Sequence, residues 1–262
     1  HMFRGSNIGT MVLPLDTSNV DSFYYTFGSC TLNNGVDLST WVFKQGTLLN
    51  NMFNTSKFTD GKVINFGNTV FSNVGMNAMF LSCTSMTESP ILNIVDTTEQ
   101  SVSYAYQEMF SSCTKLEKVN YTNPWVLCSN TTDMFRGCSK LTSIPPITFL
   151  CVSGGNRNSI SSMYAGCTVL PEVEIYINYV DDTALYVSNS FNGCKALAKL
   201  KGNLDLSNVA SATHLTTIFA NCISLVDFET TGSIAGDNTF SSATLTVSAS
   251  PVFNISLMLQ RW

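Results

Sequence analysis

Two hydrophobic patterns alternate along the chain, and the pair recurs from near its start to about residue 230. A short polar stretch ends in an aromatic residue, Cys or Ser follows three positions later, and Leu usually follows three positions after that. The aromatic residues of the eight copies are Phe27, Phe53, Phe80, Phe110, Phe135, Tyr164, Phe191 and Phe219. Successive aromatic residues are 25 to 30 positions apart. A period of this length indicates a solenoid, in which each unit is stable only when stacked on its neighbours.

The part of each unit after the Cys has the pattern of a short β-strand. The clearest copy is Val173-Glu174-Ile175-Tyr176-Ile177, where apolar and polar residues alternate. Alternation with a period of two is typical of a strand with one buried face. Because the units repeat, we expect these strands to pair in parallel and in register, about 4.8 Å apart.

The part of each unit before the aromatic residue predicts a short helical or 3₁₀ turn. Residues 131–135 and 158–164 begin with Thr, Asn or Ser, which cap helices, and end in a Met-aromatic pair. Together the two patterns predict an α/β repeat fold. It is a leucine-rich-repeat solenoid of about eight to nine units, with a parallel sheet on one face and short helical or 3₁₀ segments on the other.

The organisation follows from the repeat. Residues 1–2 resemble a cloning remnant, 3–230 are expected to form the solenoid in units of about 27 residues, and 231–262 an irregular final unit or cap. Residues 12–20 resemble the tail of an earlier unit, so we expect a fragment of a longer repeat protein without its anchoring signals. An array cut in this way would expose an apolar end, so we also expect end-to-end self-association.

The composition indicates where the protein is located and which classes of partner it binds. Charged residues make up 12% of the chain, against about 25% in ordinary soluble domains, and Ser, Thr and Asn supply much of the polar surface. This favours an extracellular, cell-surface or virion location. The net charge of −5, with no basic cluster, argues against nucleic acid. No apolar run is long enough to span a bilayer, so we expect no direct membrane insertion.

Seven of the nine cysteines occupy the same position in successive units. This periodicity predicts free, buried thiols that act as small apolar side chains. Because Ser56 takes the position in the second copy, small size is predicted to matter more there than sulfur chemistry. Cys128 and Cys151 lie outside this pattern, and either a disulfide between them or two free thiols fits the sequence.

The repeated phrase resembles the BspA-like, or Treponema pallidum type, leucine-rich repeats. The match is close in Met134-Phe135-Arg-Gly-Cys138-Ser-Lys-Leu141 and in Met109-Phe110-Ser-Ser-Cys113-Thr-Lys-Leu116. The resemblance covers roughly residues 12–230 and implies a bacterial surface protein that adheres to host proteins or cells, or a phage structural protein. It carries over no catalytic residues.

Candidates for chemistry are few. His214 is the one histidine besides His1 and is interpreted as a partly exposed residue of a predicted helical segment. The pair Asp181-Asp182 is interpreted as a solvated turn, with a calcium contact as the alternative. We expect no cofactor, no metal site and no enzymatic activity.

The outward face of the strands is the predicted binding surface. Counted from the repeated Cys, positions five and seven residues later should point to solvent. The candidate binding residues are Lys118, Asn120, Glu172, Glu174, Tyr176, Lys199, Lys201, Asp227 and Glu229; Pro90 and Pro145 fall at equivalent positions.

Two interpretations of this face remain open. The charges alternate in sign from strand to strand, which favours a ladder that stabilises register. Tyr176 as an aromatic anchor favours a recognition surface. The leading hypothesis is therefore a non-catalytic binding module for a host-surface protein or glycan, and the alternative is a structural spacer.

Overall fold

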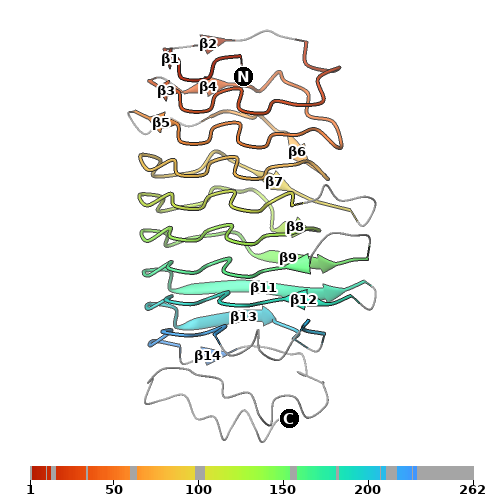
Figure 1. Ribbon diagram of the computed structural model, residues 1–262, viewed down its shortest axis with the longest axis vertical. Helices are drawn as coiled ribbons and strands as arrows, with labels where there is room; N and C mark the ends of the chain where they lie inside the picture. The colour runs from red at the N-terminus through yellow and green to blue at the C-terminus, as the bar shows by residue number, and fades with distance from the viewer. Residues whose placement is uncertain are drawn as a thin grey trace, which may run out of the picture.

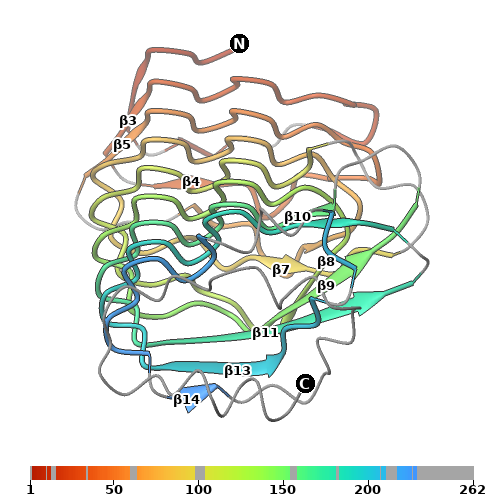
Figure 2. The ribbon, with the colours of Figure 1, turned by 60° about the horizontal axis from the view of Figure 1, so that its bottom comes forward.

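The chain is a parallel β-solenoid in which successive coils stack along one long axis (Figure 1). The computed structural model describes residues 2–9, 11–12, 16–33, 35–59, 64–97, 104–153, 158–180, 183–206, 208–210, 217–225 and 227–228. The predicted cap at 231–262 lies outside these residues. A view turned by 60° shows the undulating turn segments of the coils on a different side from β11 and β13 (Figure 2).

Short strands recur once or twice per coil. They are β1 (Asn7–Ile8), β2 (Met11–Val12), β3 (Thr31–Leu32), β4 (Val36–Asp37), β5 (Lys57–Phe58), β6 (Val70–Phe71), β7 (Asn93–Ile94), β8 (Trp125–Leu127), β9 (Ile147–Cys151), β10 (Asn158–Ser159), β11 (Glu172–Tyr179), β12 (Leu185–Tyr186), β13 (Lys199–Asn203) and β14 (Asp227–Phe228).

Every pairing between these strands is parallel and joins neighbouring coils, as the repeat predicted. The strands do not form one continuous sheet. The largest sheet has five strands in the order β14-β13-β11-β9-β8, and β1-β3-β5, β10-β12, β2-β4 and β6-β7 form smaller ones.

The segments predicted to be helical are instead runs of turns, and the described residues contain no helix. Around Phe135, the N–H groups of Asp133, Phe135 and Gly137 donate to carbonyls of the next coil at 2.8–3.0 Å. The alternate N–H groups between them donate to the carbonyl three residues back in their own coil at 3.1 Å. A helix would direct all of these donors along its own axis, whereas here half of them bind adjacent coils together.

This arrangement places a positive φ two residues before and two residues after each aromatic residue of the repeat from Phe27 to Phe191. Asp133 has φ 59° and Gly137 has φ 74°, and Asn51 and Thr55 flank Phe53 at 57° and 56°. Gly, Asn and Asp tolerate this left-handed conformation best. The prediction of a helical side was therefore wrong, and eight to nine leucine-rich-repeat units are not confirmed.

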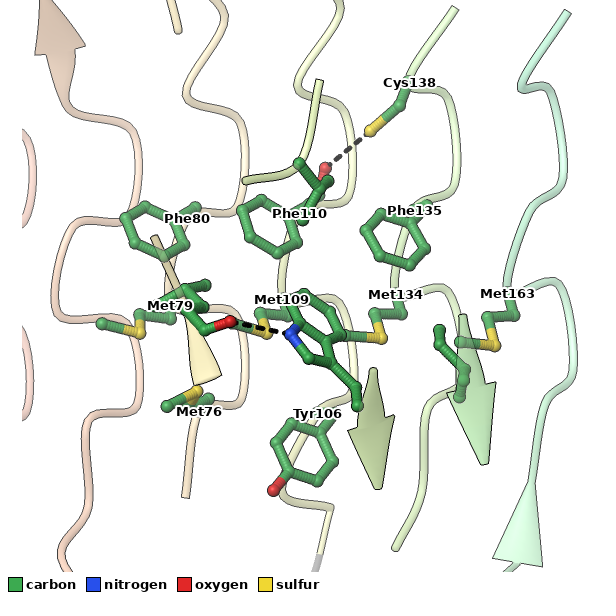
Figure 3. Packing of buried hydrophobic residues seen from close by; sticks show 14 of the residues in the cluster. Met76, Met79, Phe80, Tyr106, Met109, Phe110, Met134, Phe135, Cys138 and Met163 are labelled. Atoms are coloured by element: carbon green, nitrogen blue, oxygen red, sulfur yellow. Dashed lines mark hydrogen bonds between the residues drawn. The ribbon is translucent and has the colours of Figure 1, made fainter. Parts of the chain in front are cut away.

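The interior is organised by stacked rings. Phe80, Phe110 and Phe135 lie in one row, next to a parallel row that includes Met109 and Met134 (Figure 3). The centroids of adjacent rings are 5.1 and 5.6 Å apart, with interplanar angles of 8° and 6°. The same contacts continue along the chain through Phe3, Phe27, Phe53, Phe80, Phe110, Phe135, Tyr164, Phe191 and Phe219. The aromatic residues of the repeat are thus the continuous core.

The repeated Cys donates a hydrogen bond to the backbone of the preceding coil. The Sγ of Cys138 lies 3.0 Å from the carbonyl oxygen of Phe110 (Figure 3). The bond recurs for Cys30, Cys83, Cys113, Cys167, Cys194 and Cys222 at 2.8–3.2 Å.

Ser56 shows what this position selects. Its Oγ lies 2.6 Å from the carbonyl oxygen of Phe27, the equivalent acceptor. Thiol and hydroxyl are both small donors, so the position requires a donor as well as small size. The interpretation of the position as simply small and apolar missed this bond.

Candidate functional site

The longest strand supplies the most extended outward-facing surface. In β11, Val173, Ile175 and Ile177 point into the core and are at most 2% exposed, while Tyr176 and Asn178 face solvent. Both edges of β11 are paired, one with β9 and the other with β13. The candidate site is therefore the outward face of an interior strand and its neighbours.

The predicted charges of this face lie in register. Glu172 pairs with Lys199 and Glu174 with Lys201, while Lys199 in turn pairs with Asp227. Nζ of Lys201 forms a salt bridge with Oε2 of Glu172 at 3.0 Å, diagonally across the strands. An exposed pair of this kind contributes at most about 1 kcal/mol. Only the backbone of Asp227 is described, and Glu229 lies outside the described residues.

Tyr176 is held in place from its own strand. Its hydroxyl donates to Oε1 of Glu174 at 2.9 Å, and the side chain remains 37% exposed. The hydrogen bond to the Glu174 carboxylate raises the pKa of the Tyr176 phenol. The ring is thus presented to solvent with its polar end already bound.

Lys118 and Asn120 are placed separately from this group. Lys118 forms parallel bridges to Glu88 and Ser143. Nδ2 of Asn120 donates to Oε2 of Glu88 at 3.1 Å and to the carbonyl of Ser89 at 2.8 Å. These residues hold adjacent coils together.

Two positions predicted to face solvent do not. Pro90 and Pro145, seven residues after their Cys, are buried. In both coils the chain near this position forms single bridges instead of a continuous strand, so strict alternation is lost.

The structure places Tyr176 in a row of outward residues whose other four members the sequence did not predict. It crosses the strands at one level and consists of Val95, Val126, Thr148, Tyr176 and Asn203, each paired with the next. We call it the axial row, because it runs along the solenoid axis. The alternation in Ile147–Cys151 was the signal that would have placed Thr148 in it.

One end of the axial row carries an unsatisfied acceptor. The Oδ1 atom of Asn203 is buried and has no hydrogen-bond partner among the described residues. Gly202, just before it, has φ 95°, and an added Cβ would lie 2.3 Å from the carbonyl oxygen of Ile175. Glycine therefore lets β13 approach β11 closely beside Tyr176.

The buried carboxylate of Asp96 accepts hydrogen bonds from backbone N–H groups. Oδ1 of Asp96 accepts from the N–H of Asn73 at 2.8 Å and the hydroxyl of Tyr106 at 2.7 Å, and Oδ2 accepts from the N–H of Cys128 at 2.9 Å. Burial raises the pKa of Asp96 and of Tyr106. This cluster joins coil corners inside the solenoid.

The cysteines resemble structural thiols. All nine are buried and none forms a disulfide bond, so the possible disulfide between Cys128 and Cys151 is not formed. Burial raises the pKa of Cys167 to about 12, so this thiol stays protonated at neutral pH. Low-pKa, accessible thiols are the reactive ones.

Metal-binding clusters and membrane-spanning helices are both absent from the described part of the chain. It contains no group of three or more His, Cys, Asp or Glu side chains arranged to hold a metal ion. It also contains no helix of the length and apolarity that crossing a membrane requires. His214 and Asp181-Asp182 lie outside the described residues.

Comparison with known proteins gives one partial match. A family model described as "Mycoplasma protein of unknown function, DUF285" matches residues 1–93, and this family is associated with BspA-like repeat proteins. No curated protein and no solved structure matches the chain.

Proposed function

We propose that the chain is a non-catalytic binding module of an extracellular or virion surface protein, and that it adheres to a host-surface protein or glycan. The contact surface is the outward face of β8, β9, β11 and β13. The observation that supports it best is Tyr176, an exposed aromatic residue whose hydroxyl is hydrogen-bonded to Glu174. It lies in the axial row, which contains no charged residue. Aromatic side chains held in this way are typical anchors of recognition surfaces.

The finer parts of the resemblance belong to the same proposal. We propose that the coils are diverged BspA-like units and that each ring of the aromatic stack marks one unit, which gives the eight to nine units expected from the sequence. The partial family match over residues 1–93 supports this.

Cell adhesion tests the proposed function directly. Fluorescently labelled protein is incubated with cultured mammalian epithelial cells, and bound fluorescence is compared between the wild type and Tyr176→Ser. Tyr104→Ser is the matched control, because Tyr104 is 50% exposed and lies in a turn segment outside every strand. We expect saturable binding that Tyr176→Ser weakens at least tenfold and Tyr104→Ser leaves unchanged.

The alternative function is a structural spacer that displays another domain, and the repeated inter-coil bonding supports it. Seven thiol-to-carbonyl bonds join successive coils in the same way, which gives a stiff stack. Equal cell binding by the wild type and both variants would favour the spacer. End-to-end self-association, which fits either function, is checked by sedimentation over a concentration series.

A further inference from the structure

We propose that the ligand of this face is a neutral linear oligosaccharide that lies along the axial row, parallel to the solenoid axis. This inference rests on the proposed function, because it assigns a ligand class to the same surface. Four features carry it: the geometry of the row, its lack of charge, its mixture of apolar and polar groups, and the pairing of the strands beneath it.

The row has the shape of a track for an extended chain. Its five residues lie one per coil on consecutive coils, so at about 4.8 Å per parallel pair it is roughly 19 Å long. Val95 and Tyr176 are 39% and 37% exposed, and Val126, Thr148 and Asn203 are half-buried. A pyranose unit in a linear glycan has a length close to the spacing of the coils, so successive sugars would meet successive residues.

The charges beside the row are already paired. Lys201 is bound to Glu172 at 3.0 Å, and Glu174 accepts the Tyr176 hydroxyl at 2.9 Å. No residue of the row itself carries a charge. An anionic or cationic ligand would have to break these contacts, whereas a neutral ligand would not.

The chemistry of the row matches the two faces of a sugar ring. The negative face of the Tyr176 ring attracts C–H groups, and Val95 and Val126 offer apolar surface beyond it. Thr148, half-buried in the middle of the row, adds a hydroxyl group, which can exchange hydrogen bonds with a sugar hydroxyl. Apolar walls with a few fixed polar groups are usual in binding sites for small organic ligands.

The pairing of the strands argues against a peptide that adds to the sheet. Such a peptide needs an unpaired edge, but β9, β11 and β13 are each bonded to a strand on both sides. At this face a ligand meets side chains alone, and a sugar chain has the hydroxyl and C–H groups that these side chains bind.

Calorimetric titration with defined oligosaccharides tests the inference. The panel consists of cellohexaose, chitohexaose, xylohexaose and mannohexaose, with the disaccharide of each and a heparin hexasaccharide as the anionic comparison. We expect at least one neutral hexasaccharide to bind, more tightly than its disaccharide and with little dependence on salt. Tyr176→Ala should lower this affinity at least tenfold, and Tyr104→Ala should not change it.

A second variant tests whether the bound oligosaccharide extends along the axial row. Val95→Ser changes the end of the row farthest from Asn203. It should weaken binding of the hexasaccharide severalfold and leave the disaccharide, seated at Tyr176, unaffected.

Three results would overturn the inference: no binding of any neutral oligosaccharide, binding of the heparin hexasaccharide alone, or sugar binding that Tyr176→Ala leaves intact. These are distinct from failure of the proposed function. Cell adhesion that depends on Tyr176 and is abolished by trypsin, without sugar binding, would keep the binding module and replace the glycan with a protein. Adhesion independent of Tyr176 would remove the module itself.

Discussion

The hydrogen bond from the repeated cysteine makes a sharp prediction at Cys138. Its side chain is fully buried, and its Sγ lies 3.0 Å from the carbonyl oxygen of Phe110. Replacement by Ala removes a bond of about 1 kcal/mol and a buried group about the size of a methylene, of about 0.8 kcal/mol. Cys138→Ala should therefore lower the free energy of unfolding by about 2 kcal/mol and the Tm by about 4–8 °C.

Two further variants separate the donor from the volume. Cys138→Ser keeps a donor and should cost about 1 kcal/mol or less, because the hydroxyl remains satisfied. Cys138→Val fills the space without a donor and should be less stable than Cys138→Ser. Stability is measured by guanidinium unfolding followed by circular dichroism under reducing conditions, with an unchanged m-value as the check that the same surface is exposed.

The second coil provides an independent control. Ser56 both donates to the carbonyl of Phe27 at 2.6 Å and accepts from the N–H of Cys30 at 3.2 Å. Ser56→Ala removes two bonds and should cost more than Cys138→Ala, while Ser56→Cys should be tolerated. The reasoning is refuted by Cys138→Val and Cys138→Ala proteins as stable as the wild type beside a Cys138→Ser protein that is clearly less stable. That result would support the original interpretation, in which the position is apolar and requires only a small side chain.

Three other predictions concern the same core. Gly202→Ala should cost about 1–3 kcal/mol, because the new Cβ would lie 2.3 Å from the carbonyl oxygen of Ile175; an unchanged Tm would contradict the close approach. Burial raises the pKa of Cys167 and Cys222 from 9.0 to about 12. Their contribution to the free energy of unfolding is therefore fully present below pH 9 and is lost as the pH rises toward 12, because the unfolded thiols ionise first. Each thiol adds about 1.4 kcal/mol per pH unit to the fall, and unfolding at pH 8, 9 and 10 should show a shallower fall once both are Ser. Phe135→Ala should cost about 3–5 kcal/mol, since the ring is fully buried and stacks on both sides; a loss below 1 kcal/mol in denaturant melts would show that the stack is not the main core.

The solenoid and its register were predictable because they depend on periodicity. The aromatic-to-Cys phrase fixed which residues of adjacent coils lie side by side, and the pairing of Glu172 with Lys199 follows from it. The alternation of apolar and polar residues from Val173 to Ile177 also placed Tyr176 on the outward face. The first inference needs only that equal positions in a repeat occupy equal places in the stack, and the second needs only the period of a strand.

The turn segments were not predictable from capping residues alone. Thr, Asn and Ser before an aromatic residue fit a short helix, but they fit a left-handed turn residue equally well. The deciding signal was the pair of small or polar residues two positions before and after the aromatic one, such as Asp133 and Gly137. This pair of residues distinguishes a turn from a helix only when the hydrogen bonds to the next coil are taken into account.

The axial row was missed for a different reason. Val95, Val126 and Thr148 lie at different distances from their Cys residues, because the coils differ in length. Only the observed pairing brings them level with Tyr176. A surface assembled across coils of unequal length cannot be found from a fixed offset within the repeat.

The uniformity of the inter-coil contacts has a consequence for how such genes change. Every described coil contact uses a ring on a ring and a small donor on a carbonyl, so coils that are not neighbours have matching upper and lower surfaces. Removing residues 110–134, which joins Met109 directly to Phe135, should leave a folded protein shorter by one coil. Recombination between repeats would then alter the reach of the protein in steps of about 4.8 Å, without requiring a new core at each step.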